Sequence, residues 1–484
     1  MLNRAAPVLF VQGLLLLILT VTMAPALWLM YADGSAQAGG FAIGAAITFG
    51  CGVLLTLSSG RQHMNLSIRQ MFVLTSASWA SICLFGAMPL YFSLPALSFT
   101  DAVFESVSGI TTTGSTVLNG IDTLPRGLLM WRVMLHWFGG IGIVVIAIAI
   151  LPFLSIGGMK LFKTESSDWS DKVAPRAGSV AKSVGVVYLL LTLLCTGGYL
   201  LGGMQPFDAI THAMSTISTG GFTNYDHSFG PFADDPVILW TAIAFMLLGG
   251  MPFTLYVALL RHRRLDLFRD QQVRGFLTTA AAVSALLFLV LLFSSELRAD
   301  ELLTHVVFNV VSVLTTTGFA SDDYTLWGPF SIAIFFIITF VGGCSGSTTG
   351  GMKIFRLQIG TEVLNHQLKQ LLHGNGVFAL KYNGRRISDE LITSITAFSF
   401  FFLLTIAVLT LLLSLLGLDL VTALTGAASS VANVGPGLGT TIGPAGNFHS
   451  LPDAAKWLLS IGMLLGRLEI MTVLVLFTKA FWRW

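Results

Sequence analysis

The sequence carries little charge. Only 10% of its 484 residues are Asp, Glu, Lys or Arg, whereas 54% are hydrophobic. A soluble domain of this length needs far more charged surface to stay in water. The composition therefore excludes a soluble protein and predicts an all-α polytopic membrane protein embedded in a lipid bilayer.

The sequence also lacks the residue patterns of common enzymes. Its nine histidines show no zinc-ligand spacing, and neither a Ser/His/Asp set nor a carboxylate pair recurs at one depth. No Rossmann or P-loop glycine motif is present, so any nucleotide control belongs to another chain. We expect no enzyme activity, no organic cofactor and no nucleic-acid partner. The four cysteines lie in apolar stretches and are expected to be free, buried thiols, namely Cys51, Cys83, Cys195 and Cys344.

One short stretch occurs four times. The third copy reads Ser-Val-Leu-Thr-Thr-Thr-Gly and ends at Gly318, and the other copies end at Gly114, Gly221 and Gly435. These glycines are 107, 97 and 117 residues apart. A near-constant period indicates that one structural unit of the chain is repeated four times. We call the copies filter loops 1 to 4. The expected site residues are Thr111, Thr112, Thr113 and Gly114 in loop 1; Thr219, Gly220 and Gly221 in loop 2; Thr316, Thr317 and Gly318 in loop 3; and Asn433, Val434 and Gly435 in loop 4.

Ten apolar segments are long enough to cross a bilayer, which takes about 20 helical residues. The first could instead be a signal peptide, but it is too long and no convincing cleavage site follows it. The segments are 7–30, 38–58, 70–92, 131–154, 183–203, 237–260, 275–294, 329–355, 391–416 and 455–480.

A shorter semi-apolar segment precedes each filter loop and is too short to span. It is typical of a re-entrant helix, whose loop must be covered by protein or water. Each unit is therefore helix, pore helix, filter loop and helix, and the first two spans stand outside the pattern. We expect an N-terminal helix pair over 1–66 and pore repeats over 67–179, 180–272, 273–386 and 387–484.

Charge placement predicts the orientation. With this topology, 21 of the 26 Lys and Arg residues lie on one side. The positive-inside rule makes that side the cytoplasm, so both termini are expected there and the filter loops enter from outside. The basic loops are either ordinary topology signals or docking sites for a partner. The basic residues include Lys160, Lys163, Lys172, Arg263, Arg264, Lys353 and Arg356.

The repeated loops have the chemistry of a cation filter. A dehydrated monovalent cation needs several oxygens, which backbone carbonyls and threonine hydroxyls supply without a fixed charge. Glycine allows the dihedrals that turn successive carbonyls toward one axis. Four such loops around a pseudo-fourfold pore would bind K⁺. The alternative is that Thr-Thr-Gly only caps a helix in a tightly packed bundle.

The eighth span contains a glycine-rich segment, 342–351, that we name the gate segment. Five glycines among ten residues are costly in a continuous helix, at about 1 kcal/mol each relative to alanine. The helix is expected to break there and to obstruct the pore below the filter. The alternative is a kink for close helix packing. Its residues are Gly342, Gly343, Cys344, Ser345, Gly346, Ser347, Thr348, Thr349, Gly350 and Gly351.

Arg467 is a charge inside the last span. Buried charges in a membrane are costly and usually functional. When the second helices of the repeats are aligned on Gly139, Gly249, Gly342 and Gly466, Arg467 stands where the other three repeats have glycine, at Gly140, Gly250 and Gly343. We expect Arg467 to face the pore below the filter and to oppose cation flow. The alternative is a structural pair with Glu469, which i,i+2 spacing disfavours on one helix.

Other polar residues recur near the filter. Glu105, His212 and Asn309 all lie nine positions before their filter glycine and are expected to support the filter backbone from behind. Asp101 and Asp208 lie at the starts of pore helices, where a cap is favoured over an ion site.

Taken with Gly466-Arg467-Leu468-Glu469 and the Gly-Gly-Met-Lys runs ending at Lys160 and Lys353, these motifs resemble the Trk type of potassium uptake subunit (TrkH family). The wider superfamily includes Ktr and plant HKT proteins, and the two extra N-terminal helices resemble the Trk branch. The resemblance implies a homodimer in the bacterial inner membrane, regulated by a cytosolic nucleotide-binding ring protein of the TrkA kind. In this superfamily, serine at the first filter glycine goes with sodium transport, so glycine in all four loops favours potassium. Asn433-Val434 makes loop 4 the least regular.

Two kinds of function remain open. The favoured one is a channel-like K⁺ uptake subunit, with a Na⁺- or H⁺-coupled symporter as its closer rival; the filter loops contain no acidic residue, which argues against tight coupling. A polytopic membrane enzyme is the other class and would need a catalytic cluster that the sequence does not offer.

Overall fold

The computed structural model describes the chain except residues 1, 60–66, 150–172, 263–265, 294, 296, 374–378 and 484. The Gly-Gly-Met-Lys run ending at Lys160 and the basic residues Lys163, Lys172, Arg263 and Arg264 lie outside the described residues.

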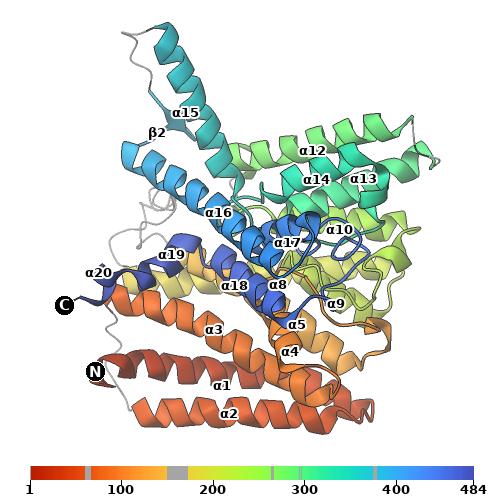
Figure 1. Cartoon of the computed structure of the whole chain (residues 1–484), viewed down its shortest axis with the longest axis vertical. Helices are drawn as coiled ribbons and strands as arrows, with labels where there is room; N and C mark the ends of the chain where they lie inside the picture. The colour runs from red at the N-terminus through yellow and green to blue at the C-terminus, as the bar shows by residue number, and fades with distance from the viewer. Residues whose placement is uncertain are drawn as a thin grey trace.

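The regular secondary structure of the described residues is helical apart from one short hairpin, which confirms the predicted all-α class. α1 (Leu2–Ala32) and α2 (Ala38–Ser59) pack against each other and precede the repeats (Figure 1). The hairpin pairs β1 (Lys381–Tyr382) with β2 (Arg385–Arg386), antiparallel, after α15. Figure 1 shows α15 projecting from the body of the molecule, and shows the starts of α1 and α20 near one edge.

Four units follow the helix pair, and each contains a short pore helix. The first unit has α3 (Ile68–Ser93), the pore helix α4 (Phe99–Ile110) and α5 (Arg126–Ala149), and the second has α8 (Val173–Leu201), the pore helix α9 (Pro206–Ile217), α10 (Pro236–Gly249) and α11 (Phe253–His262). The third unit has α12 (Gln271–Leu291), the pore helix α13 (Ala299–Leu314), α14 (Pro329–Thr339) and α15 (Ile354–Leu372). The fourth has α16 (Asp389–Leu415), the pore helix α17 (Leu420–Ala432), α18 (Asp453–Arg467), α19 (Ile470–Leu474) and the terminal α20 (Lys479–Trp482). Short 3-10 turns lie at Ile121–Thr123, Gly230–Phe232, Asp266–Phe268, Tyr324–Trp327 and Val475–Phe477.

The number of continuous spans differs from the ten expected. Within the described residues, seven helices are long and apolar enough to cross a membrane, or nine if two bent pairs each count as one span. The segments 237–260 and 455–480, expected to be straight, bend by 91° between α10 and α11 and by 107° between α18 and α19. Pro252 lies at the first bend and lacks the N–H that would continue the helix. At the second bend, Glu469 adopts a left-handed φ of 58°.

The eighth predicted span is divided. α14 ends at Thr339 and α15 begins at Ile354, so the glycine-rich residues between them are not helical. This break agrees with the glycine content of the segment.

Local capping defines the pore helices. The N-caps of α4 and α17 are Ser98 and Asp419, whose side chains accept hydrogen bonds from backbone N–H groups of the first turn, whereas α9 has Pro206 at its first position. Asp101 and Asp208, expected as caps, lie three residues inside the N-caps Ser98 and Gln205.

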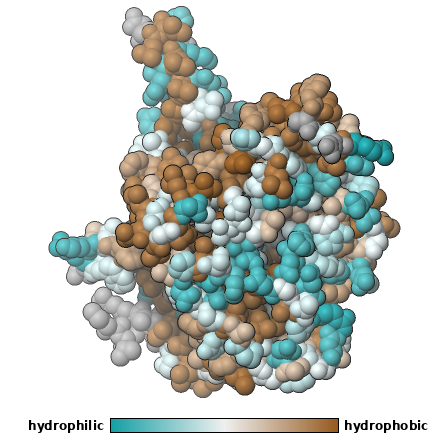
Figure 2. All heavy atoms as spheres, turned by 45° about the vertical axis from the view of Figure 1, so that its right-hand side comes forward, coloured by the Kyte–Doolittle hydropathy of each residue, from teal (hydrophilic) through white to brown (hydrophobic). Residues whose placement is uncertain are grey.

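The outer faces of the long helices keep large apolar side chains exposed, among them Leu201, Leu411 and Leu415. Figure 2 shows apolar residues on the projecting segment and along the body, with hydrophilic residues gathered on the face turned toward the viewer. An exposed apolar surface of this kind fits a multi-pass membrane protein.

Candidate functional site

All four filter loops adopt one backbone conformation. The residue two before each filter glycine has a left-handed φ of 50–55°, namely Thr112, Thr219, Thr316 and Asn433. The glycines themselves have φ of 88°, 89°, 79° and 112°, in chain order. One residue without a left-handed φ separates the two in each loop. Such alternation turns successive carbonyls in the same direction, and non-glycine residues adopt it only where the surroundings enforce it.

In each loop, the residue with a left-handed φ two positions before the filter glycine also caps the pore helix. In loop 1, Thr112 N–H donates to Gly109 O and Thr113 N–H to Ser108 O, and the same pair of bonds recurs in the other three loops. This is the Schellman motif that ends many helices. The capping role weighed as an alternative is therefore present, and the filter loop continues directly from it.

The four loops close into a ring. A β-carbon built on Gly114 would lie 2.4 Å from the carbonyl oxygen of Gly220, one on Gly221 would lie 2.1 Å from Thr317 O, and one on Gly318 would lie 2.1 Å from Val434 O. On Gly435 it would lie 2.7 Å from Thr113 O. Each filter glycine thus packs on the carbonyl of the residue before the filter glycine in the next loop, and loop 4 returns to loop 1. Approaches this close require glycine.

Two of the three supporting residues contact the loops. The Glu105 carboxylate accepts hydrogen bonds from Val117 N–H (3.0 Å) and the Thr116 hydroxyl. The Asn309 amide accepts one from Ser321 N–H (3.2 Å) and donates to the Ser321 hydroxyl. Val117 and Ser321 each follow their filter glycine by three residues, so the supporting residue contacts the same position of the loop in repeats 1 and 3.

His212 does not make this contact among the described residues. Its Nδ1 lies 2.8 Å from Asp208 O in its own helix, and its ring packs on Phe229 and Phe232. Asp208 supports loop 2 instead by accepting hydrogen bonds from Asn224 and Tyr225. Burial and this acceptor raise the pKa of Tyr225 to about 12.

In repeat 4 the backing residue is Thr425, whose hydroxyl accepts from Leu438 N–H at 3.0 Å. The residue nine positions before the filter glycine of this repeat is Gly426, which has no side chain that could make the contact. Thr425 was missed, and Asp208 was expected only as a helix cap, because neither lies nine positions before its filter glycine.

The gate segment lies at the C-terminal ends of the pore helices. Thr348 donates from its hydroxyl to Ile217 O (3.0 Å), and Gly351 N–H donates to Ala432 O (2.8 Å). Gly350 N–H donates to the Thr316 hydroxyl in loop 3 at 2.7 Å. Contacts to Gly249 O and Gly250 O join the segment to the bend after α10. Repeats 2, 3 and 4 therefore hold the segment directly beside the filter loops.

Arg467 is buried and contacts the gate segment. Its Nη1 donates to Thr348 O at 2.9 Å, and Nε and Nη2 have no hydrogen-bond partner in the described chain. The alternative pairing with Glu469 is absent, since Glu469 accepts from Arg356 at 2.7 Å. Arg467 is the last residue of α18, so the last predicted span bends directly after it instead of continuing as one helix.

Lys353 and Arg356, counted among the basic loop residues that were expected to be topology signals or docking sites, are buried inside the protein. They are only 8% and 2% exposed. Lys353 donates to the Thr349 carbonyl, and Arg356 stacks on the Phe398 ring with Cζ 3.7 Å from its centroid. With Arg467, three basic side chains and the Glu469 carboxylate therefore gather next to the gate segment.

The second helices of three repeats place a glycine at the same point beside their pore helix. A β-carbon on Gly139, Gly249 or Gly466 would meet the carbonyl four residues before the filter glycine, at 1.9, 3.0 and 1.9 Å. Gly342 instead packs on Gly350 O, because the third helix has already broken.

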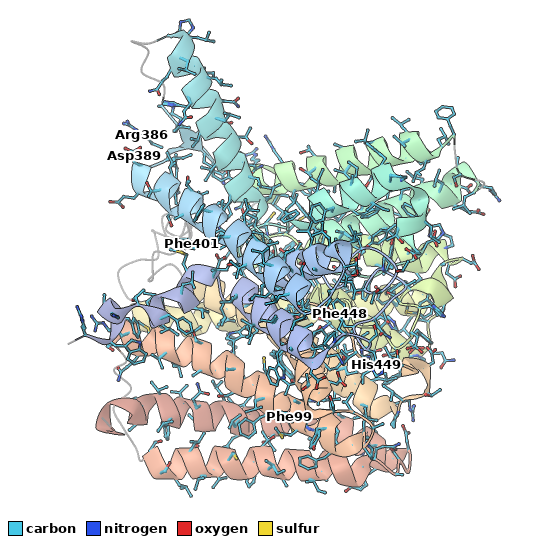
Figure 3. The ribbon with its side chains drawn as sticks, in the orientation of Figure 1. Phe99, Arg386, Asp389, Phe401, Phe448 and His449 are labelled. Carbon is cyan, nitrogen blue, oxygen red and sulfur yellow. The ribbon has the colours of Figure 1, made fainter. Side chains whose placement is uncertain are left out.

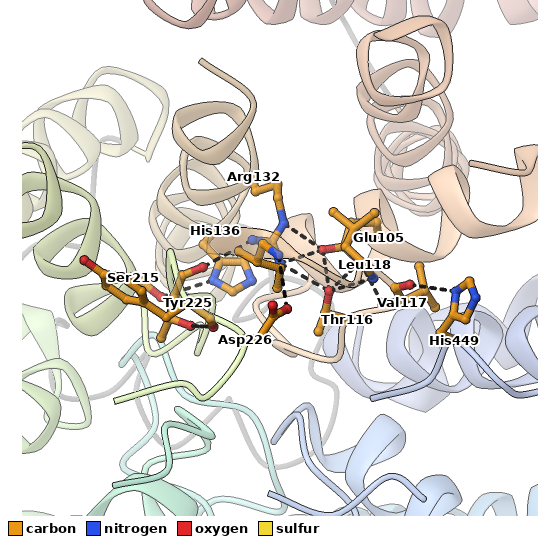
Figure 4. A network of polar contacts seen from close by, with 12 residues as sticks. Glu105, Thr116, Val117, Leu118, Arg132, His136, Ser215, Tyr225, Asp226 and His449 are labelled. Carbon is orange, nitrogen blue, oxygen red and sulfur yellow. Dashed lines mark hydrogen bonds and ion pairs between the residues drawn. The ribbon is translucent and has the colours of Figure 1, made fainter. Parts of the chain in front are cut away.

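Two buried residues of α5 were missed by the sequence analysis. Arg132 donates to Glu105 (2.8 Å), to Thr223 O (3.2 Å) and to the Thr116 hydroxyl (3.3 Å), joining loops 1 and 2 (Figure 4). His136, one turn later, stacks on Phe222 with ring centroids 4.0 Å apart. No motif marks either residue.

The segment before α18 joins repeat 4 to repeat 1. Phe448 N–H donates to Thr116 O at 2.9 Å, and His449 Nδ1 lies 3.1 Å from Val117 O. Figure 3 labels both residues beside α18, and the Phe448 ring packs on Phe104 with centroids 5.5 Å apart.

Comparisons with known proteins agree with this architecture. The family model described as TrkH, a cation transport protein, matches residues 39–483. The Trk system potassium uptake protein TrkI of Halomonas elongata is 54% identical, with 100% of this chain and 98% of the relative covered. The Trk system potassium uptake protein TrkH of Escherichia coli K12 is 37% identical, with 98% of each covered. The crystal structure of the potassium transporter TrkH from Vibrio parahaemolyticus superposes with a TM-score of 0.91 at 34% identity, covering 99% of both chains.

Proposed function

Because the chain belongs to the TrkH family of cation transport proteins, we propose that it takes up K⁺ through a pore whose selectivity filter is the ring of four loops. The observation that carries this proposal is the cyclic packing of each filter glycine on a carbonyl of the next loop. Carbonyls held in a closed ring replace the hydration shell of a cation without a fixed charge. The relatives named as potassium uptake proteins support K⁺ as the ion.

The gate segment is the proposed barrier below the filter. It is held by hydrogen bonds from the pore helices and from loop 3, and Arg467 adds a buried positive charge at Thr348. A cation that leaves the filter inward meets this charge, which opposes its passage by Coulomb repulsion in a low-dielectric site. Conduction therefore requires the segment and Arg467 to move apart.

The proposal includes the membrane setting. The filter faces outside, both termini lie in the cytoplasm, and the membrane is the bacterial inner membrane. Support comes from the basic residues on the inner side and from the large exposed apolar surface. A homodimer and a cytosolic nucleotide-binding ring protein of the TrkA kind complete the proposed assembly, on the strength of the family resemblance.

The test is cation flux into liposomes that contain the purified protein, comparing K⁺, Rb⁺, Na⁺ and Li⁺. We expect K⁺ and Rb⁺ to pass well ahead of Na⁺, and Gly318→Ser to weaken that preference because its β-carbon would press on Val434 O. Equal flux of all four ions in the wild type, or an unchanged preference in Gly318→Ser, would overturn the filter. Uptake that stops when the Na⁺ or H⁺ gradient is removed would instead identify a coupled symporter.

A further inference from the structure

Filter loop 2 differs from the others at one position. The residue before the filter glycine is Thr113 in loop 1, Thr317 in loop 3 and Val434 in loop 4, but it is Gly220 in loop 2. The φ of Gly220 is not in the left-handed region, so its backbone does not require glycine. The reason for a glycine must therefore be space.

His136 occupies that space. A β-carbon built on Gly220 would lie 1.9 Å from Nδ1 of His136, 2.4 Å from Cγ and 2.7 Å from Cε1. All three are ring atoms of one side chain on α5. A threonine at this position would collide with the imidazole.

The imidazole is itself held in place. His136 is fully buried, its ring is nearly parallel to that of Phe222 at an interplanar angle of 12°, and Nδ1 lies 3.5 Å from the Ser215 hydroxyl (Figure 4). Ser215 O in turn accepts from Gly220 N–H at 2.9 Å. The ring therefore contacts loop 2 on both sides of Gly221 and cannot easily turn away.

Arg132 strengthens the same contact. Its Cζ lies 4.3 Å from the Phe222 centroid, and its Nη1 donates to Thr223 O. The second helix of repeat 1 thus supports the filter loop of repeat 2 over consecutive residues.

The matching positions in two other second helices are occupied differently. Relative to Gly249 and Gly466, the equivalents of His136 are Met246 and Met463. In loops 1 and 3, hydroxyl contacts between Thr111 and Thr113 (2.7 Å) and between Thr315 and Thr317 (2.8 Å) stiffen the loop instead. Loop 2 lacks the second hydroxyl because it has Gly220.

We propose that His136 is a positioning residue for ion selectivity, whose ring takes the place of the missing side chain of Gly220 and fixes the Gly220 carbonyl in the filter. The inference rests on the proposed function. A rigid ring packed on a glycine limits the movement of the adjacent carbonyl, and a filter discriminates between K⁺ and Na⁺ only if its oxygens hold their spacing or field.

The experiment uses the full chain in liposomes and measures K⁺ against Na⁺ flux for Gly220→Thr, His136→Ala and the double variant. We expect each single change to lower the K⁺ preference by about tenfold or more, Gly220→Thr by collision and His136→Ala by leaving loop 2 loose. In the double variant the threonine fills the space that the imidazole leaves, so the preference returns toward the wild-type value. Monodispersity and thermal unfolding in detergent are followed in parallel, and if Gly220→Thr alone fails to fold, recovery of folded, selective protein in the double variant is the expected result.

Gly318→Ser separates this inference from the filter itself. Gly318 lies against loop 4, so His136→Ala should not rescue Gly318→Ser. The inference is overturned if Gly220→Thr keeps the wild-type preference, if the double variant is no better than Gly220→Thr, or if His136→Ala rescues Gly318→Ser equally. If Gly318→Ser also leaves the preference unchanged, the proposed filter fails as well.

Discussion

Arg356 and Glu469 form a buried ion pair between two broken helices. Arg356 Nη2 lies 2.7 Å from Glu469 Oε2, in side chains that are 0% and 10% exposed. Arg356 belongs to the first turn of α15, and Glu469 lies at the bend of the chain between α18 and α19. The pair therefore ties the chain below the gate segment to the bend that carries Arg467.

Removing one partner of this pair should destabilise the protein. Glu469→Gln leaves the Arg356 charge buried with a neutral partner, which costs about 3–5 kcal/mol for pairs of this kind. Thermal unfolding in detergent should show a clear loss, and Arg356→Met combined with Glu469→Gln should recover part of it.

The matched control is the exposed pair of Arg298 and Asp300, whose side chains are 74% and 68% exposed. Asp300→Asn should change stability by less than about 1 kcal/mol. Equal effects of Glu469→Gln and Asp300→Asn would contradict the account.

Arg467→Ala should raise K⁺ flux. It removes both the hydrogen bond to Thr348 O and the buried charge, while Arg467→Lys keeps the charge and should have a smaller effect. Flux per reconstituted molecule, measured in liposomes, gives the comparison. Unchanged or lower flux in a folded Arg467→Ala protein would remove Arg467 from the barrier.

Thr316→Val should loosen the contact between loop 3 and the gate segment. The Thr316 hydroxyl accepts from Gly350 N–H, and losing it leaves a buried donor unpaired at about 1–3 kcal/mol. Thr112→Val is the matched control, because Thr112 occupies the same position in loop 1 with a hydroxyl that has no partner among the described residues. Thermal unfolding should separate the two variants. A larger loss in Thr112→Val would contradict the assigned contact.

The Asp419 cap at the start of α17 predicts a loss of thermal stability at acid pH. Its side chain accepts hydrogen bonds at the start of α17, from Thr422 above all, and these lower its pKa. The stabilisation is present above the ordinary pKa of about 3.9 and is lost as pH falls through the lower folded value. Asp419→Asn keeps the cap at neutral pH but should flatten the loss of thermal stability below about pH 4. An unchanged slope would show that the cap does not titrate.

The pore helices, the filter loops and the break in the eighth span could be predicted from the sequence. Four Thr/Gly stretches at a near-constant period indicated the pore helices and their loops, and five glycines in the gate segment indicated the break after Thr339. Both follow from local backbone preferences, which a single segment carries by itself.

The remaining features depend on contacts between distant segments. Apolar composition runs through both bends, so only Pro252 could have signalled the first, and Glu469 gave no such signal for the second. Lys353 and Arg356 looked like loop cations because their burial depends on Thr349, Phe398 and Glu469 folding around them. Gly220 could have been singled out from the aligned loops, where it alone replaces a residue with a side chain, but only the structure shows that His136 fills the space beside it.

The most direct test of the central claim is to locate the bound ion. Crystals of the protein grown with Rb⁺ or Tl⁺ in place of K⁺ would give an anomalous-difference map. The account predicts a peak on the axis enclosed by the carbonyl oxygens of Thr113, Gly220, Thr317 and Val434, weakened in Gly318→Ser. A peak elsewhere in a transport-competent protein, with none inside the ring, would contradict it.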